Sequence, residues 1–253
     1  MKLARFLYKK KPEWGIIEGD SVIILKGKPY SGIKRSSMRI PLGAVRLLVP
    51  AEPSKIVLVG LNYRDHAAEL GMKIPKEPVI FMKPTTSLVA NGENIIYPKG
   101  VSRVDYEAEL ALVIKKKGRN IPANEAAGYI LGYTCLNDVT ARLIQRRDVQ
   151  WTRAKSYDTF CPLGPHLETS INTKNLRVRC KVNGKIKQDC TTSGFIFDPF
   201  KLVSFISNVM TLHPGDIIST GTPSGVGPVK VGERVSVHIE GIGRLTNKVV
   251  GGR

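Results

Sequence analysis

The sequence predicts an α+β fold that is predominantly β, closer to a β-roll than to a doubly wound sheet. Short apolar runs separated by turn residues recur along the chain, whereas few segments have helical periodicity. The 253 residues, 42% of them hydrophobic and 24% charged, are enough to bury a sizeable core. No run of 18 uncharged apolar residues is present, and the N-terminus lacks the apolar segment of a signal peptide. We therefore expect a soluble, cytoplasmic protein without a membrane partner.

The N-terminal fifth is predicted to be a separate unit. Residues 14–25 contain two apolar runs joined by Gly19-Asp20, a dipeptide typical of a two-residue β-hairpin. The rest of this stretch is also strand-and-turn in character. We predict a small β-rich N-terminal domain at 1–52 and a larger domain at 53–253.

The larger domain is expected to combine strands with a few short helices. Strands are expected at 55–60 (KIVLVG) and 106–114, with a hairpin at 176–188 through Asn183-Gly184. Helices are expected at 62–71 with Asn62 as the N-cap, at 125–131, at 138–147, and from Asp198-Pro199 to about Met210. The proline-rich segment 72–84 indicates a loop or the edge of a sheet.

The chain is strongly basic, with 39 Lys and Arg against 21 Asp and Glu and a net charge of +18. Such a charge is typical of proteins that bind nucleic acid, but it also suits small dianionic substrates. The lysine runs at 9–11 and 115–117 look like strand ends and turns, and only 7% of residues are aromatic. The scatter of charge favours a small anion over nucleic acid.

Four cysteines are present, and no pair has the CxxC spacing of a metal or redox motif. Cys180 and Cys190 flank the Asn183-Gly184 turn. A two-residue hairpin there places Cys180 opposite Lys187, so the two cysteines are out of register and we expect no disulfide between them.

Three acidic residues, Asp105, Glu107 and Glu109, lie two residues apart and would share one face of a strand. Like charges packed this closely repel one another unless a cation lies between them. A solvated strand end is the alternative. In a basic chain, however, an acidic cluster is unexpected.

A second polar group, Asp138, Arg142 and Gln145, has the spacing of one face of a helix, with Asp138 at its N-terminal end. The alternative is an N-cap aspartate followed by two surface residues. Together the two segments offer carboxylate oxygens and no soft ligand, which favours Mg²⁺ or Mn²⁺ over zinc.

Other segments contain residues that are common in active sites. His66 and Glu69 are three residues apart on the predicted short helix and could act as a general base and the group that orients it, or form a surface ion pair. The segment 151–156 (WTRAKS) contains Lys155. The segment 220–227 (TGTPSGVG) is a turn whose backbone N–H groups and hydroxyls could face a carboxylate, although it could equally be a bend between strands.

The order of these motifs resembles the fumarylacetoacetate hydrolase family over about residues 53–250. The matching stretches are NYRDHAAELG, YEAEL, NDVTAR with a glutamine three residues on, WTRAKSYD and LHPGDIISTGTPSGVGPV. The chain is most similar to the bacterial and archaeal acylpyruvate hydrolases and 2-hydroxyhepta-2,4-diene-1,7-dioate isomerases. One departure is Leu143, where many relatives have aspartate.

The resemblance implies a mixed β-roll, a homodimer and a role for each motif. It implies metal ligation by Glu107, Glu109 and Asp138, with Asp105 outside the ligand set. The remaining roles it implies are a catalytic dyad of His66 and Glu69, an active-site Lys155, and substrate contacts from Arg142, Gln145 and Thr222.

The implied reaction is hydrolytic C–C cleavage of a 2,4-dioxo acid (an acylpyruvate, for example) through an enolate bound to Mg²⁺ or Mn²⁺. The same site could instead serve a diene-dioate isomerase or an oxaloacetate decarboxylase, and such enzymes act in the catabolism of aromatic compounds. The alternative from another class is a basic nucleic-acid-binding protein with an inactive enzyme fold.

Overall fold

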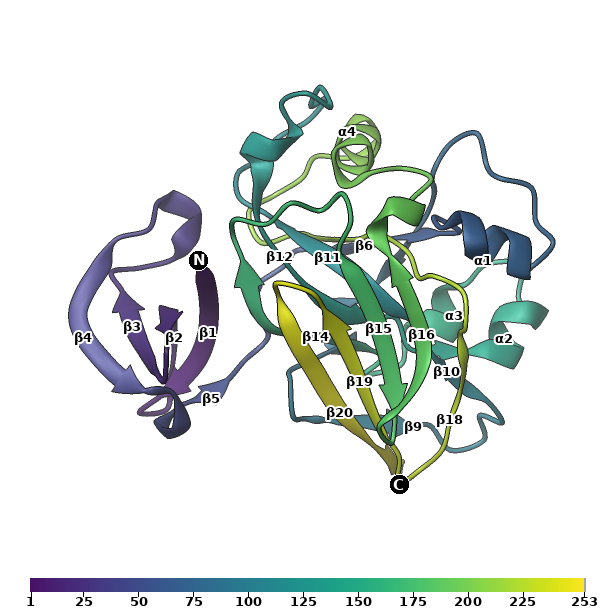
Figure 1. Ribbon diagram of the computed structural model, residues 1–253, viewed down its shortest axis with the longest axis horizontal. Coiled ribbons are helices and arrows are strands. Elements are labelled where there is room, and N and C mark those ends of the chain that lie inside the picture. The colour runs from purple at the N-terminus through teal and green to yellow at the C-terminus, as the bar shows by residue number, and fades with distance from the viewer. Residues whose placement is uncertain (253) are drawn as a thin grey trace.

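The computed structural model describes residues 1–252, and its fold is mostly β (Figure 1). The N-terminal strands are β1 (Lys2–Tyr8), β2 (Lys11–Glu18), β3 (Ser21–Leu25), β4 (Arg35–Pro41) and β5 (Arg46–Leu47). The next strands are β6 (Ile56–Gly60), β7 (Val79–Lys83), β8 (Leu88–Val89), β9 (Asn94–Tyr97), β10 (Val104–Tyr106), β11 (Ala108–Ile114), β12 (Ile130–Asn137) and β13 (Thr140–Ala141). The last are β14 (Cys161–Glu168), β15 (Arg177–Val182), β16 (Lys185–Thr191), β17 (Ile217–Ser219), β18 (Gly227–Val229), β19 (Arg234–Ile239) and β20 (Gly243–Gly251).

The helices are few and mostly short. The α-helices are α1 (Arg64–Glu69), α2 (Arg142–Arg147), α3 (Thr152–Lys155) and α4 (Pro199–Val209). Single 3₁₀ turns occur at Pro29–Ser31, Leu42–Ala44, Thr85–Ser87, Ala126–Tyr129 and Thr192–Gly194. None of the helices within residues 1–252 is long and apolar enough to cross a membrane.

Three sheets make up the molecule. The largest runs in the order β4-β3-β2-β1-β14-β12-β11-β17-β6-β7, with β5 and β8 attached at its sides. A five-stranded sheet has the order β16-β15-β19-β20-β9, and a small sheet joins β13, β10 and β18. The strands β1–β5 stand to one side in Figure 1, while α1, α2 and α3 gather at the opposite side of the body. The division into domains at 1–52 and 53–253 stays a prediction, because β1 pairs directly with β14 in the large sheet.

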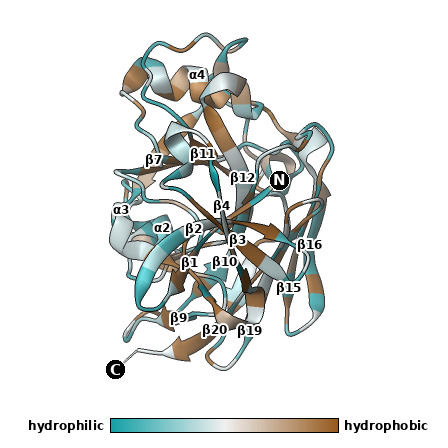
Figure 2. Cartoon of the chain, turned by 90° about the vertical axis from the view of Figure 1, so that its left-hand side faces the viewer, coloured by the Kyte–Doolittle hydropathy of each residue, from teal (hydrophilic) through white to brown (hydrophobic). Residues whose placement is uncertain are grey.

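The central strand β11 explains how the body is packed. All seven of its residues are buried, as expected for a strand covered on both faces. Leu110, Leu112 and Ile114 belong to one hydrophobic cluster, while Ala111 and Val113 belong to another on the other face. Figure 2 shows the hydrophobic residues gathered on strands. The strand is therefore fixed within the interior, which makes its N-terminal end a rigid place for polar side chains.

The predicted α+β, predominantly β fold class is confirmed, as are most of the individual elements. The hairpin through Gly19-Asp20 joins β2 to β3, and the one through Asn183-Gly184 joins β15 to β16. Both residues of the second turn have positive φ, 48° and 82°, which is why Asn-Gly suits it. Cys180 pairs with Gln188 rather than with the predicted Lys187, because the pairing shifts register between Cys180 and Lys181. Cys180 and Cys190 are both free.

Three helix predictions were inaccurate. The helix predicted at 138–147 begins only at Arg142, because the chain first continues from β12 into β13. The segment predicted as a helix at 125–131 is a single 3₁₀ turn that leads into β12. The α1 N-cap is Tyr63 rather than Asn62. The Asn62 amide instead donates to the carbonyls of Phe197 and Thr220 at 2.9 and 2.7 Å.

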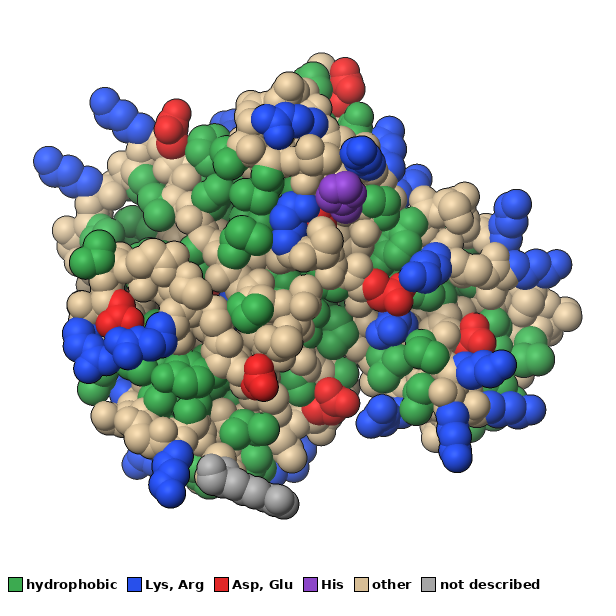
Figure 3. Space-filling model, turned by 180° about the vertical axis from the view of Figure 1, so that it is seen from behind, with side chains coloured by type: hydrophobic (Ala, Val, Ile, Leu, Met, Phe, Trp, Pro, Cys, Tyr) green, Lys and Arg blue, Asp and Glu red, His purple; other side chains and the backbone are tan. Residues whose placement is uncertain are grey.

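Basic side chains are distributed over the surface. Figure 3 shows Lys and Arg spread across one face of the molecule, including the N-terminal strands, without one continuous stripe.

Candidate active site

Three buried carboxylates meet at one end of β11. Glu107 lies in the break between β10 and β11, Glu109 is on β11, and Asp138 follows the last residue of β12. The two strands are adjacent and antiparallel, with Ala108 opposite Asn137, so the end of β12 brings Asp138 next to the two glutamates. One oxygen from each residue lies within 4.8 Å of the others. We call Glu107, Glu109 and Asp138 the acidic triad.

The position of Glu109 is fixed from the neighbouring turn. Its Oε2 accepts hydrogen bonds from the Ser219 hydroxyl and from the Gly221 N–H at 3.0 Å. Gly221 has a φ of 87°, and a Cβ there would lie 2.9 Å from the Asn62 Cβ. Only glycine therefore allows the backbone to approach this carboxylate so closely.

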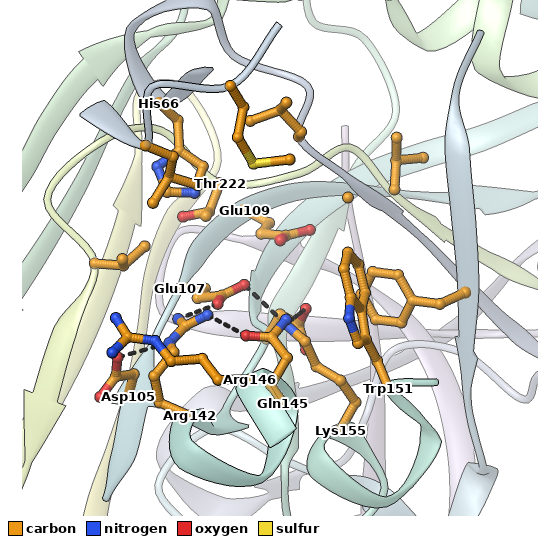
Figure 4. Close-up of a pocket in the computed structure, with 18 of the residues that line it drawn as sticks. His66, Asp105, Glu107, Glu109, Arg142, Gln145, Arg146, Trp151, Lys155 and Thr222 are labelled. Atoms are coloured by element: carbon orange, nitrogen blue, oxygen red, sulfur yellow. Dashed lines mark hydrogen bonds and ion pairs between the residues drawn. The ribbon is translucent and has the colours of Figure 1, made fainter. Parts of the chain in front are cut away.

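Basic groups neutralise the other two carboxylates of the triad (Figure 4). Glu107 forms an ion pair with Arg142 and another with Lys155, whose Nζ lies 3.0 Å from Oε2. The same Nζ is 2.6 Å from Asp138 Oδ2, so the Lys155 ammonium bridges the two residues. The Lys155 ammonium group therefore occupies part of the space between Glu107 and Asp138.

Lys83, on β7, is fully buried beside Asp138. Its Nζ donates to the carbonyls of Val139, Lys155 and Phe160 at 2.9, 2.6 and 2.7 Å. Because these use all three ammonium protons, Asp138 Oδ1 accepts no hydrogen bond although it lies 2.8 Å from Nζ. Asp138 Oδ1 is therefore compensated by the Lys83 charge alone and keeps its hydrogen-bonding capacity, so it could also act as a hard oxygen ligand to a metal ion.

The two glutamates of the triad have opposite pKa shifts. Burial raises the pKa of Glu109 well above its usual range, and the charges of Asp138 and Glu107 raise it further. Burial also acts to raise the pKa of Glu107, but the charges of Lys155 and Arg142 outweigh it and lower the pKa to about 2. Three hard oxygen ligands this close together, one of which is discouraged from ionising by the other two, fit a divalent cation.

The structure corrects one detail of the sequence-based site, the placement of Asp138 on a helix, and leaves Asp105 outside the triad, where the family resemblance put it. Asp105 does not join the triad: it pairs with Arg103 at 2.8 Å and with Arg142 at 2.8 Å. Asp138 does not lie on the helix face of Arg142 and Gln145, because it precedes β13. Its position depends on strand pairing rather than on helical periodicity. Arg142 and Gln145 do share a face of α2, where the guanidinium donates to the amide oxygen.

The His66–Glu69 pair lies on α1. His66 Nδ1 is 2.8 Å from Glu69 Oε2, and Glu69 Oε1 accepts the N–H of Gly225 at 3.0 Å. The imidazole is largely buried and lines the same cavity as the triad. Because Nδ1 faces the carboxylate, Nε2 is the ring atom left for chemistry in the cavity.

The turn at 220–227 connects the cavity to α1. Thr222 Oγ1 donates to the Ala108 carbonyl at 3.0 Å and accepts from the buried Gln188 amide at 2.8 Å. The hydroxyl of Ser224 donates to Asp65 of α1 at 2.7 Å. The turn therefore contacts both β11, the strand that carries Glu109, and α1, the helix that carries His66.

Eight of the nine residues singled out in the sequence line one cavity of about 310 Å³. The ninth, Glu69, lies behind His66 and contacts the His66 ring. The other lining of the cavity is mostly apolar and comes from Val59, Gly60, Leu61, Leu70, Met72, Phe81, Trp151 and Val226, together with Arg103, Asp105 and Arg146. Phe81 and Trp151 pack edge to face with centroids 5.4 Å apart. Such a cavity suits a small anionic molecule with an apolar portion.

Sequence reasoning missed Lys83, Gln188 and Ser219. Each holds a site residue or its backbone in place without lining the cavity itself. The only available indication was that Lys83 ends the apolar run VIFMK. A charged residue in such a run lies either at a sheet edge or in the interior with a partner that compensates its charge. Nothing in the local pattern indicates the other two.

Comparisons with known proteins agree with this geometry. The profile of the fumarylacetoacetate (FAA) hydrolase C-terminal region matches residues 55–250, and a profile named Rv2993c-like, N-terminal, matches residues 1–50. A crystal structure described as 5-carboxymethyl-2-hydroxymuconate delta-isomerase from Mycobacterium smegmatis is 42% identical, with a TM-score of 0.95 and full coverage of both chains.

Two other relatives have names that indicate different reactions. The rat protein named mitochondrial oxaloacetate tautomerase Fahd2a is 44% identical over 223 residues, covering 83% of this chain and 71% of its own. A maleylpyruvate hydrolase from Sphingobium sp. SYK-6, solved with manganese(II) and pyruvate, is 30% identical with a TM-score of 0.83 and full coverage of both chains. The structural likeness, the buried acidic triad and the family profile together lead to one conclusion: this chain belongs to the fumarylacetoacetate hydrolase family.

Proposed function

We propose that the protein is a divalent-metal-dependent hydrolase that cleaves a C–C bond in a 2,4-dioxo acid such as an acylpyruvate. The observation that carries the proposal is that the His66–Glu69 pair and the acidic triad line the same cavity. A bound cation and a general base facing one space are what hydrolysis of an activated carbonyl requires. Related proteins described as a hydrolase, an isomerase and a tautomerase support an enzyme of this family.

In this proposal the acidic triad holds Mg²⁺ or Mn²⁺. Asp138 Oδ1, which accepts no hydrogen bond although it lies in an ion pair with Lys83, and the raised pKa of Glu109 beside two other carboxylates support that assignment. When bound there, a divalent cation would attract the carboxylate and C2 oxygen of a 2-oxo acid and favour negative charge on that oxygen.

The protein side chains have distinct tasks. His66 Nε2 takes a proton from a water molecule, while Glu69 holds the ring through Nδ1 and stabilises its charge. The water oxygen adds to C4, the C3–C4 bond breaks, and C3 takes up a proton. The products are a carboxylic acid and pyruvate. Arg142, Gln145 and Thr222 contact the substrate, and the Lys155 ammonium adds positive charge that helps to hold an anionic substrate.

The same site could move a proton without water attack. The similarity to the rat tautomerase favours this second reading, in which the protein is a diene-dioate isomerase or tautomerase, or an oxaloacetate decarboxylase. Both readings use His66 as the proton carrier. They differ in whether a water molecule remains beside the substrate.

We further propose that the protein acts in the cytoplasm as a homodimer on a small 2-oxo acid or diacid. The partner proposed is not a nucleic acid. The basic charge then serves to attract anionic substrates.

A substrate panel tests the proposal. Purified protein would be incubated with Mg²⁺ or Mn²⁺ and acetylpyruvate, fumarylpyruvate, oxaloacetate or 2-hydroxyhepta-2,4-diene-1,7-dioate, and pyruvate and ultraviolet absorbance would be followed. We expect metal-dependent release of pyruvate from an acylpyruvate. Absorbance change without pyruvate would favour the isomerase. If no substrate of the panel is turned over faster with Mg²⁺ or Mn²⁺ than with chelator, both readings are refuted.

A further inference from the structure

The cavity contains one basic side chain that no protein carboxylate neutralises. Four basic residues line it, and three of them are paired: Arg103 with Asp105, and Arg142 and Lys155 with carboxylates that include Glu107. No carboxylate among residues 1–252 lies within ion-pair distance of the fourth, Arg146. Its guanidinium keeps its hydrogen-bonding capacity for a ligand.

The position of Arg146 on α2 places it above the buried end of the cavity. Gln145 and Arg146 lie three and four residues after Arg142, about one helical turn on, and all three line the cavity (Figure 4). A rise of about 1.5 Å per residue separates Arg146 from Arg142 by roughly 6 Å along the helix axis. The Arg142 side chain is 13% exposed, whereas Arg146 is an exposed residue, so the helix runs from the triad toward the mouth.

The remaining walls narrow the choice of ligand group that Arg146 could meet. The wall from Leu70, Met72, Phe81 and Trp151 is apolar and offers one indole N–H as its side-chain hydrogen-bonding group. A neutral polar tail would find few partners there, whereas a carboxylate would find a planar guanidinium that can bind both of its oxygens.

We propose that Arg146 is a specificity-determining residue that binds the distal carboxylate of a 2-oxo diacid. The inference rests on the proposed function, in which the 2-oxo acid end of the substrate lies at the triad. It narrows the substrate class to diacids, because a monoacid would leave this guanidinium without a partner. The spacing along α2 fits a distal carboxylate about one helical turn from the buried end.

The neighbouring residue supplies a matched control. Arg147 has the same chemistry and the same helix, but it lines a different surface hollow and lies 3.6 Å from Asp148. If the general positive field of α2 attracted the substrate, both arginines would matter equally. If Arg146 binds a carboxylate in the cavity, only Arg146→Gln should discriminate between ligands.

The test compares two ligands that differ only in that carboxylate. The binding of 2-oxoglutarate and 2-oxopentanoate, both five carbons long, would be measured by calorimetry with Mn²⁺ for the wild type, Arg146→Gln, Arg146→Lys and Arg147→Gln. We expect Arg146→Gln to weaken 2-oxoglutarate about tenfold, equivalent to ~1.4 kcal/mol, and 2-oxopentanoate less than about twofold. Arg146→Lys should recover part of the loss, and Arg147→Gln should change neither ligand by more than about twofold.

Turnover separates this inference from the proposed function. On fumarylpyruvate, Arg146→Gln should raise KM with little change in kcat, and on acetylpyruvate it should change neither. Equal effects of Arg146→Gln on the two five-carbon ligands, or no effect, would overturn the inference. Absence of turnover on any substrate would refute the proposed function alone, since the binding comparison would still report on Arg146.

Discussion

Replacing Lys83 with methionine should destabilise the protein severely. Methionine keeps much of the aliphatic stem but removes the ammonium that holds three carbonyls and lies 2.8 Å from Asp138 Oδ1. The change leaves a buried carboxylate beside an apolar side chain, and breaking a buried ion pair in this way costs about 3–5 kcal/mol. For a chain of this size each kcal/mol lowers Tm by roughly 2–4 °C, so we expect a fall of about 6–20 °C.

The assay is thermal unfolding followed by calorimetry in the presence of chelator, so that the chain alone is compared. A matched control is Lys201→Met, because Lys201 is 64% exposed and lies 4.0 Å from Asp198, a surface pair worth less than about 1 kcal/mol. A Lys83→Met variant that unfolds within about 2 °C of the wild type would refute the reasoning. It would mean that water or a neighbouring group can replace the ammonium.

Four further outcomes are expected. Glu109→Gln should abolish metal-dependent activity while the far-ultraviolet circular dichroism stays native; full activity in EDTA would contradict the metal assignment. Because the pKa of Glu109 is raised, metal binding must displace its proton, so Mn²⁺ affinity should increase with pH. Calorimetry in buffers of different ionisation enthalpy should show the release of this proton. An affinity that does not depend on pH, with no proton release, would contradict this prediction. His66→Ala should lower kcat by about 10²–10⁴ and leave Mg²⁺ affinity nearly unchanged, and normal turnover on the true substrate would exclude it as the base. Hydrogen exchange of residues 62–78, which precede the paired strand β7, should be faster than that of β6 in the free protein and should slow when oxalate binds; equal protection without ligand would argue against a closing segment.

The residues singled out in the sequence line one cavity, whereas part of the local structure predicted around them was wrong. Turn dipeptides and apolar runs predicted the hairpins and β6, because those signals are local. Asp138 was grouped with Arg142 for the wrong reason: the spacing fits a helix, but pairing of Asn137 with Ala108 continues β12 up to the residue before Asp138, and β13 follows before the helix begins. Strand pairing between distant segments overrides helical spacing, and one sequence does not reveal it.

Supporting residues could not be predicted for a related reason. The partners of Lys83 are backbone carbonyls from three separate segments, one of them the end of α3, and carbonyls carry no sequence signature. Likewise, Gln188 matters because β16 runs past the turn that carries Thr222. The motif residues face the cavity, whereas their supports are defined only by the assembled fold.

The turn at 220–227 has a consequence for the timing of the reaction. Thr222 faces the cavity, while Ser224 and Gly225 bond to Asp65 and Glu69 of α1. A ligand that presses on the turn therefore also shifts the anchor of the helix that carries the base. This turn therefore links how well the substrate fits the cavity to how long the ligand stays bound. A substitution in the turn that changes substrate binding should also change the rate of product release.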